Sequence, residues 1–543
     1  MSSSSGTAPF ERLGKACVRF RLNRTYVTDG RFLFVPPDAT DFCPLCFERR
    51  HRAQFPAAPE LHSLPPAALE LARQFDKAAR HTDEWVAQAL KPGAARQNFR
   101  LFGFEDCPRC QPPQAALSPA EAAEYYELKL TGPSPDFNPE NLSRRVFSFG
   151  FAHRAMMMNR SRLDDPRLTN LIADGHHARV LYRMVVPDGR FTDAATTGYD
   201  TDPAHASLKA LMEYAERYAF NLHVTPARAE RADPELIDGY MQLYRRPLSA
   251  AEKKQAENEA VWGVDLLRGT PRAIPLPFLF SYQAFRDVKP TSSGYGAHGS
   301  FGDAVASGIV ELVERDAFVR FWHDPGRARL LELPPPQEQA LTSVAAATAA
   351  AATIPPLTSR AFLIPSPLRI PVVLLAISSD HPEQGPALLF GFGAGLTLDE
   401  AAYGALRELR LNAMNLVRAL KMMPDLLTQH PPAKVDGIAQ RMQLYASAVP
   451  RPHLRFLDEA DMAQADDCTS CPPDLDALLD RFRNAEIDIH AVDCTPECLA
   501  DLGVHVVRAF STGLYPLQFE REDTLSLPRS DGYAGKHLSH FFL

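Results

Sequence analysis

The chain contains 543 residues, of which 45% are hydrophobic and 23% are charged, a balance typical of a folded globular protein. A formal net charge of −8 excludes a broadly basic surface for nucleic acid, and no apolar run is long enough to span a bilayer. The N-terminal sequence lacks the apolar core of a signal peptide. We therefore expect a cytoplasmic protein with neither a nucleic-acid nor a membrane partner.

Two Cys-x-x-Cys pairs stand out in the N-terminal part of the chain. They comprise Cys43, Cys46, Cys107 and Cys110, and both have the form Cys-Pro-x-Cys. Structural disulfides are rare in a reducing compartment, whereas two such pairs supply the four thiolates of a tetrahedral zinc site. The sequence therefore predicts a structural Zn²⁺ ion, and the alternative is four unrelated thiols.

Proline becomes frequent between residues 111 and 141, around one predicted short helix at 119–130. Such a change in composition is typical of a connection between domains. We expect a small zinc-binding domain at 1–140 and a larger domain at 141–543.

The larger domain alternates helical and strand-like patterns. Apolar periodicity predicts three long amphipathic helices, at 203–222, 302–323 and 398–420. Apolar runs before, between and after them predict strands, at 178–186, 370–378, 387–395, 487–493 and 504–510. The alanine-rich stretch 345–353 predicts one further helix. This alternation predicts an α/β fold of mixed sheets and long helices.

Two of the predicted helices carry glutamates three residues apart. These are Glu213 and Glu216 on the first helix and Glu311 and Glu314 on the second, each pair in an E-x-x-E-R context. That spacing places both carboxylates on one helix face among apolar residues, where like charges are costly unless a cation neutralises them. Because Mg²⁺ takes oxygen ligands and commonly binds phosphates, two facing pairs predict a site for Mg²⁺ and a nucleotide. The alternative is that the glutamates are solvated and paired with the arginines that follow them.

A glycine-rich segment, residues 291–300, leads directly into the second glutamate helix. Glycines let backbone N–H groups approach an anion at a helix N-terminus, which favours phosphate binding. The segment lacks the Gly-Lys-Ser/Thr ending of a Walker A loop, so its signal is weak by itself.

A second group of thiols follows near the C-terminus. It comprises Cys468, Cys471, Cys494 and Cys498, with unequal spacing within the pairs. A second zinc site and incidental buried thiols are both compatible with this spacing, and the sequence leaves the two alternatives open.

Four segments, in this order along the chain, resemble signature sequences of the YcaO family. ASLKALMEYAERYA resembles the first glutamate helix of the family, and TSSGYGAHGSFGDAVASGIVELVERDAF resembles its glycine turn and second glutamate helix. GFGAGLTLDEAAYGALRE resembles the third helix, and LGVHVVRAFSTGLYPLQF resembles the last core strand. The resemblance covers residues 145–543 and implies a YcaO-type fold preceded by the small zinc-bound domain.

The resemblance also implies an activity. YcaO proteins use ATP and Mg²⁺ to activate a backbone amide of a peptide. In azoline-forming members a Cys, Ser or Thr side chain attacks the preceding carbonyl, and phosphorylation of the resulting oxyanion allows its loss. By resemblance, the four helix glutamates hold Mg²⁺ and phosphates, while Glu408 and Arg508 contact the nucleotide. The implied protein is an ATP-dependent cyclodehydratase subunit that acts on a ribosomally made precursor peptide.

Several positions depart from the usual residues of the family. Where the family usually has Gly-Lys-Gly before the first helix, this chain has Gly198, Tyr199 and Asp200. Ser293 replaces an asparagine of the nucleotide pocket, and Leu411 replaces a glutamine. Lys209 replaces a serine, and we expect it to supply the charge lost at Tyr199 because it lies one helical turn from Glu213. The proline-rich tail of azoline-forming members is also absent. Two alternatives therefore remain, namely a non-catalytic scaffold for peptide and partner subunits, and a YcaO enzyme that forms a thioamide or amidine.

The cysteine segments resemble a known partner of these enzymes. DFCPLCFERRHRAQF and FEDCPRCQ resemble the zinc elements of the ThiF-like protein that accompanies YcaO enzymes and recognises the leader of the precursor peptide. The stretch before Cys43 is too short for a whole leader-binding domain. We therefore expect a separate leader-binding ThiF-like subunit, a flavin-dependent dehydrogenase and a homo- or hetero-oligomeric assembly.

Overall fold

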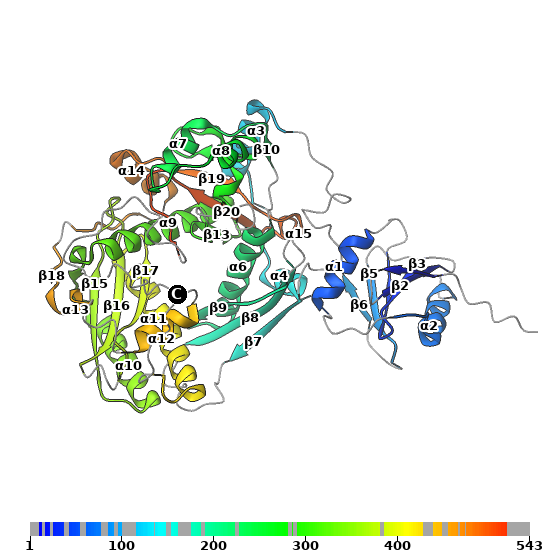
Figure 1. Ribbon diagram of the computed structural model, residues 1–543, viewed down its shortest axis with the longest axis horizontal. Coiled ribbons are helices and arrows are strands. Elements are labelled where there is room, and N and C mark those ends of the chain that lie inside the picture. The colour runs from blue at the N-terminus through cyan, green and yellow to red at the C-terminus, as the bar shows by residue number, and fades with distance from the viewer. Residues whose placement is uncertain are drawn as a thin grey trace, which may run out of the picture.

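The computed structural model describes the chain in a series of segments (Figure 1). The described residues are 10–13, 17–21, 25–36, 43–54, 61–77, 85–91, 96–99, 116–134, 136–147, 154–160, 175–185, 191–222, 227–280, 285, 290–380, 385–426, 438–447, 454–464, 467–472 and 474–518. No helix within these ranges combines the length and the apolar character that a bilayer span requires.

The N-terminal part contains a six-stranded antiparallel sheet with one helix on each face. The strands are hydrogen-bonded in chain order: β1 (Phe10–Leu13), β2 (Cys17–Arg21), β3 (Thr25–Thr28), β4 (Phe32–Val35), β5 (Trp85–Ala89) and β6 (Arg96–Phe99). Alternate side chains of a strand point to opposite faces of the sheet. Phe34 therefore packs in one core with α1 (Pro44–Gln54), and Leu33 packs in the other with α2 (Pro66–Lys77).

Three further sheets form the larger part of the chain. The first consists of β7 (Arg154–Arg160), β8 (His176–Val185) and β9 (Phe191–Asp200). The second has the order β10 (Arg228–Ala229), β11 (Ala260–Asp265), β19 (His490–Asp493), β20 (His505–Phe510) and β13 (Tyr295–His298), and β12 (Thr270–Pro275) pairs with β11. The third has the order β17 (Leu389–Ala394), β16 (Val372–Ser379), β15 (Leu357–Leu363), β14 (Arg329–Leu330) and β18 (Asp461–Met462). The predicted α/β class with mixed sheets is confirmed.

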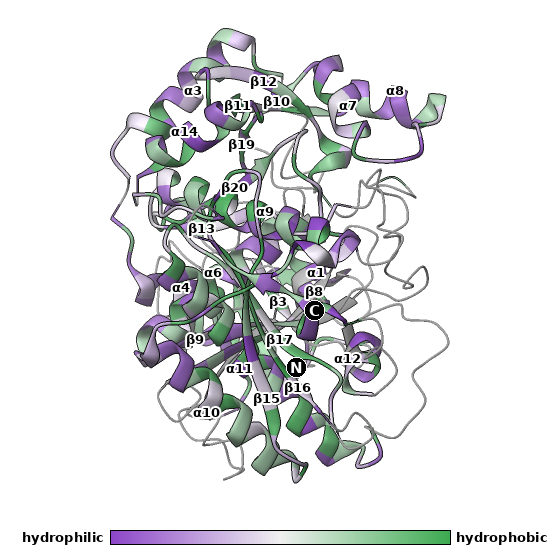
Figure 2. Cartoon of the chain, turned by 90° about the vertical axis from the view of Figure 1, so that its left-hand side faces the viewer, coloured by the Kyte–Doolittle hydropathy of each residue, from purple (hydrophilic) through white to green (hydrophobic). Residues whose placement is uncertain are grey.

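One edge strand of each of these sheets leads into a long helix. β9 leads into α6 (Pro203–Leu222), β13 into α9 (Phe301–His323) and β17 into α11 (Leu398–Met422). We call these strand–helix pairs the first, second and third unit. In Figure 2, α6, α9, β13 and β20 lie in the middle of the molecule, between β11, β12 and β19 above and the β15–β17 sheet below.

The three units share one register. Their edge strands carry Gly198, Gly296 and Gly393, and each helix begins five residues after its glycine. A Cβ atom at any of the three positions would overlap backbone atoms of the helix that follows. Glycine therefore lets each helix lie directly against its own strand, which fixes where every side chain of the helix points.

The short helix predicted at 119–130 is α3 (Pro119–Thr131), and it packs against β11, β12 and α9. Its Tyr125 hydroxyl donates to the carboxylate of Asp493 at 2.6 Å, and the Lys129 ammonium group lies 2.8 Å from the same oxygen. α4 (Pro139–Val146) packs against α6. The boundary near residue 140 stays a prediction, since α3 on its N-terminal side contacts the larger part of the chain.

The remaining elements surround these layers. They are α7 (Pro234–Met241), α8 (Ala250–Asn258), α10 (Pro335–Ala352), α12 (Ile438–Ala446), α13 (Phe456–Glu459), α14 (Leu475–Ala485), α15 (Glu497–Ala500) and two 3-10 turns, Leu276–Phe278 and Pro325–Arg327. The alanine-rich stretch forms the C-terminal part of α10, as predicted. The three long helices and five strands predicted in the larger domain are confirmed, with small differences at their ends.

Candidate functional site

The acidic side chains of the three helices follow the shared register. Glu213, Glu311 and Glu408 stand fifteen residues after the glycines of their units. Glu216 and Glu314 stand eighteen residues after them, where the third unit has Leu411 instead. The two glutamate pairs predicted to share a helix face therefore occupy equivalent positions in the first and second units.

Two glutamates are tied to the strands of their own units. The backbone N–H of Thr197 on β9 donates to Glu213 Oε2 at 2.9 Å, and that of Phe392 on β17 donates to Glu408 Oε2 at 2.7 Å. Both donors precede the unit glycine by one residue. Each carboxylate is thus held over the edge strand from which its own helix begins.

Two other glutamates reach from one unit to the next. The backbone N–H of Ala297 on β13 donates to Glu216 Oε1 at 3.0 Å, which joins the first unit to the second. The backbone N–H of Ala394 on β17 donates to Glu314 Oε2 at 2.8 Å, which joins the second unit to the third. We call these contacts the first and second interfaces. Each places the carboxylates of one helix beside those of the next.

The contact between the third unit and the first is built differently. Leu411 packs in an apolar core that also contains Tyr199. The guanidinium group of Arg410 lies over the Tyr199 ring, 5.3 Å from its centroid, and donates to the Tyr199 hydroxyl. Two of the departures noted in the sequence, Tyr199 and Leu411, therefore belong to this third interface, where an aromatic–cation contact stands in the place of a carboxylate.

Arginines beside the glutamates partly compensate their charge. Arg315 Nη1 lies 2.7 Å from Glu314, and its Nη2 lies 3.2 Å from Glu311. Arg217 Nη2 lies 3.3 Å from Glu213. The arginine pairing that the sequence left as an alternative is therefore present. It does not make the cluster a solvated surface, because the Glu314 side chain is only 14% exposed.

Burial and mutual repulsion raise the pKa values of three carboxyl groups in this cluster. For Glu216 and Glu311 burial is the largest cause, and the charge of Glu311 raises the pKa of Glu216 further. Burial and the charge of Glu314 raise the pKa of Glu408 to about 7. The glutamates of the three helices outnumber the two arginines, Arg217 and Arg315, that pair with them.

This excess of oxygen ligands has the chemistry that a hard divalent cation prefers. Among the described residues, however, no three acidic, His or Cys side chains converge on a single point as a complete protein-only metal site would require. The donor set therefore fits Mg²⁺ that draws part of its coordination from phosphates and water.

The glycine segment ahead of α9 brings Arg508 to this cluster. Gly294, with φ of 81°, lies so close to Ala509 and Gly308 that a Cβ atom would stand 2.6 Å from the Ala509 carbonyl oxygen. Arg508 Nη1 donates to the Thr291 carbonyl at 2.9 Å, and the positive charge of Arg508 lowers the pKa of Glu311. Glycines here therefore serve the close packing of β13, β20 and α9.

Ser293 and Lys209 have partners within the chain. Ser293 is buried, and its hydroxyl lies 2.6 Å from that of Thr291. The Lys209 ammonium group donates to the Asp200 carboxylate and lies 5.9 Å from the ring centroid of Tyr403. The positive charge beside Tyr199 is that of Arg410. That Lys209 supplies the charge lost at position 199 stays a prediction.

The thiols fall into different parts of the structure. Cys43 and Cys46 are buried at the beginning of α1, whereas Cys107 and Cys110 lie outside the described residues. In the second group, the backbone N–H of Cys471 donates to a carbonyl of the loop before α11. Cys494 directly follows β19, and Cys498 lies in α15. No metal-binding group of three or more His, Cys, Asp or Glu side chains occurs in the described segments, so nothing in them supports a second zinc site.

Reasoning from the sequence missed Arg410 and the backbone donors of the edge strands. A signal for the donors was available, because three glycines each precede a helix start by five residues and a glutamate by fifteen.

A comparison with family models places these units in a known family. The model described as a YcaO cyclodehydratase that binds ATP and Mg²⁺ matches residues 197–515. This chain belongs to the YcaO family. The match includes the glycine, the helix and the glutamates of all three units, together with Arg508, so the family named from sequence motifs is confirmed.

Three solved structures are similar to this chain. A heterocyclase in complex with substrate and cofactor has a TM-score of 0.59 and 15% identity, covering 92% of this chain and 76% of that one. The YcaO protein of Methanopyrus kandleri bound with AMPPCP and Mg²⁺ has a TM-score of 0.47 and 18% identity, covering 76% and 96%. The E. coli microcin synthetase McbBCD complex has a TM-score of 0.47 and 14% identity, covering 66% and 88%. No curated protein matches in sequence.

Proposed function

We propose that the chain is an ATP- and Mg²⁺-dependent cyclodehydratase subunit that converts Cys, Ser or Thr residues of a ribosomally made precursor peptide to thiazolines or oxazolines. The observation that carries this proposal is the pair of acidic interfaces, where partly buried carboxylates outnumber the guanidinium groups that pair with them. Buried like charges are costly unless a cation compensates them, and a Mg²⁺–nucleotide complex supplies that cation.

Each part of the cluster has a proposed role. Bound ATP supplies the phosphoryl group that turns a peptide amide oxygen into a good leaving group. The chain orients the reacting groups and neutralises charge, which is how proteins accelerate phosphoryl transfer. The residues that would hold Mg²⁺ are Glu213, Glu216, Glu311 and Glu314, and those that would contact the nucleotide are Glu408, Arg508, Ser293 and Lys209.

Calorimetric titration with a non-hydrolysable ATP analogue, with and without Mg²⁺, tests this function. We expect a Kd on the order of ten micromolar, about −7 kcal/mol, only when Mg²⁺ is present. The same protein incubated with ATP and a precursor peptide should remove one water per ring, which mass spectrometry detects. Absence of nucleotide binding, even with partner subunits present, contradicts the enzyme and favours the scaffold. Nucleotide binding with a thioamide or amidine product would instead reassign the reaction.

The partners follow from this function. We propose that the precursor peptide is presented by a leader-binding ThiF-like subunit, that a flavin-dependent dehydrogenase oxidises the azolines to azoles, and that the chain works in a homo- or hetero-oligomer in the cytoplasm. Co-purification of a tagged chain with these candidate subunits, with and without precursor peptide, measures each association separately.

We also propose that Cys43, Cys46, Cys107 and Cys110 hold a structural Zn²⁺ ion. In support, Cys43 and Cys46 are both buried at the start of α1, three residues apart. Elemental analysis of the purified protein should give one zinc per chain, and the double substitution of Cys107 and Cys110 by Ser should remove it. Zinc retained in that variant contradicts the ligand set.

A further inference from the structure

Arg508 is a buried cation held without a carboxylate against its guanidinium group in the described part of the chain. Its side chain is 3% exposed. Nη1 donates to the Thr291 carbonyl at 2.9 Å, and the guanidinium carbon lies 5.0 Å from the ring centroid of Tyr295. Nε has no hydrogen-bond partner among the described residues. A buried guanidinium group that is only partly satisfied is costly and calls for an explanation.

The Tyr295 ring is itself fixed in place. Tyr295 begins β13 and stands directly opposite Arg508 of β20 in the antiparallel register. The ring of Phe220 on α6 packs against it at a steep angle, with centroids 5.7 Å apart. Gly294, the residue before Tyr295, lets the two strands approach closely at this point, and the Ala509 N–H donates to its carbonyl at 2.7 Å.

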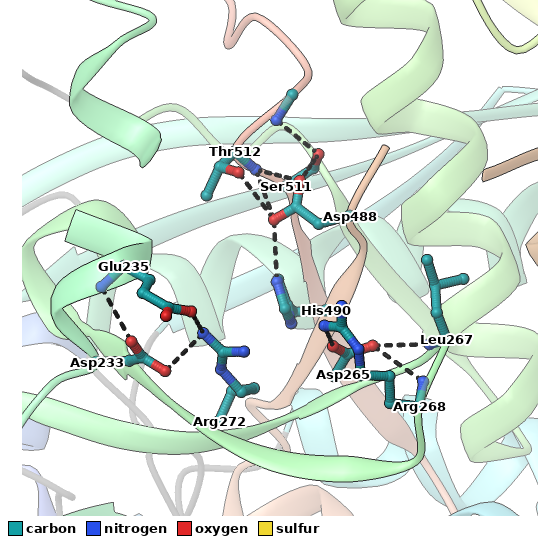
Figure 3. A network of polar contacts seen from close by, with 11 residues as sticks. Asp233, Glu235, Asp265, Leu267, Arg268, Arg272, Asp488, His490, Ser511 and Thr512 are labelled. Atoms are coloured by element: carbon teal, nitrogen blue, oxygen red, sulfur yellow. Dashed lines mark hydrogen bonds and ion pairs between the residues drawn. The ribbon is translucent and has the colours of Figure 1, made fainter. Parts of the chain in front are cut away.

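The far end of β20 is anchored as well (Figure 3). Beyond the end of the strand, the Asp488 carboxylate accepts bonds from the Ser511 hydroxyl and from the backbone N–H and hydroxyl of Thr512. His490 Nε2 lies 3.0 Å from the same carboxylate. The strand that carries Arg508 is therefore held on both sides of that residue.

We propose that Tyr295 is a positioning residue that holds the guanidinium group of Arg508 ready for a nucleotide phosphate. An aromatic face attracts a cation through its quadrupole and leaves the cation's net charge intact. A carboxylate in the same place would neutralise that charge. The ring therefore steadies Arg508 and keeps its full charge available for an anion. This inference rests on the proposed function, because it requires that a Mg²⁺–nucleotide complex binds beside Glu311.

Replacing Tyr295 by phenylalanine and then by phenylalanines with one, two and three ring fluorines tests the proposal. Fluorination weakens the ring quadrupole with little change in ring volume, so the variants keep the packing of β13. We expect Tyr295→Phe to bind the ATP analogue with Mg²⁺ within about twofold of the wild type. The trifluorinated variant should bind it roughly tenfold more weakly, with intermediate values between them.

The same series at Phe220 is the matched control. Phe220 packs against the Tyr295 ring, and its fluorination should leave nucleotide affinity unchanged, which separates a cation–π effect from altered packing. A flat series at Tyr295 in a protein that binds the nucleotide overturns the positioning role alone. A wild-type protein that binds no Mg²⁺–nucleotide overturns the proposed function, and this inference with it.

Discussion

Glu314 on α9 accepts a hydrogen bond from the backbone N–H of Ala394 on β17 at 2.8 Å, and so joins the second unit to the third. Glu216 joins the first unit to the second through Ala297 in the same way. Side chains proposed to hold Mg²⁺ thus also connect the units of the fold. The proposed binding of Mg²⁺ would therefore be coupled to the spacing of the units.

Glu311→Gln should abolish Mg²⁺-dependent nucleotide binding while the protein stays folded. Glutamine keeps the size of the side chain and can still accept the bond from Arg315. Burial raises the pKa of Glu311, so removing its charge carries no penalty for stability. Titration calorimetry and thermal unfolding measure the two properties. Glu338→Gln, an exposed position on α10, should change neither. Normal binding by Glu311→Gln would contradict the metal assignment.

Glu408 should make stability depend on pH. Its pKa of about 7 in the folded protein exceeds the ordinary value of 4.5, so the folded state binds more protons than the unfolded one between these pH values. Stability from this group is present below pH 4.5 and is lost as the pH rises through 7. A shift of this size corresponds to roughly 3 kcal/mol.

Glu408→Gln should remove that loss. Its unfolding free energy should exceed that of the wild type at pH 8 and match it near pH 4, as measured by denaturant titration at both values. Glutamine still accepts the bond from Phe392, so the comparison isolates the charge. Equal pH profiles of the two proteins would show that Glu408 titrates normally.

The unit glycines should tolerate no side chain. Gly296→Ala places a Cβ against the backbone of α9, so we expect a loss of about 3 kcal/mol of stability from overpacking. Gly302 lies within α9, and a Cβ atom there would meet nothing within 4 Å. Gly302→Ala should therefore stabilise the protein by up to about 1 kcal/mol. Chemical denaturation of both variants checks this contrast, and similar effects at the two positions would refute it.

Tyr199→Phe should weaken the third interface and leave nucleotide binding intact. The substitution removes the hydroxyl that accepts a bond from Arg410, and loss of a buried bond to a charged group costs about 1–3 kcal/mol. Thermal unfolding should therefore show a lower midpoint, while calorimetry should show an unchanged affinity for the ATP analogue. A large fall in affinity would place Tyr199 in the nucleotide pocket.

The sequence predicted elements and helix faces well because both depend on local periodicity. Glu213 and Glu216 share a face in any α-helix of this sequence, whatever surrounds it. The partners of these glutamates were out of reach, because backbone N–H groups carry no residue signature. The contact between Arg410 and Tyr199 could not be predicted either, because 211 positions separate the two residues along the chain. The family resemblance marked Tyr199 and Leu411 as unusual, and only the structure places both at one interface.

The pairing of β13 with β20 has a consequence for how the protein is made. The bond from Arg508 to Thr291 closes a separation of 217 residues, and long-range strand pairing of this kind is slow to form. Synthesis proceeds from the N-terminus, so β13 and both glutamate helices leave the ribosome long before their last partner strand. Arg508, which we propose to contact a nucleotide phosphate, is synthesised last. A chain truncated before residue 505 retains every helix glutamate and still lacks the strand that completes the sheet.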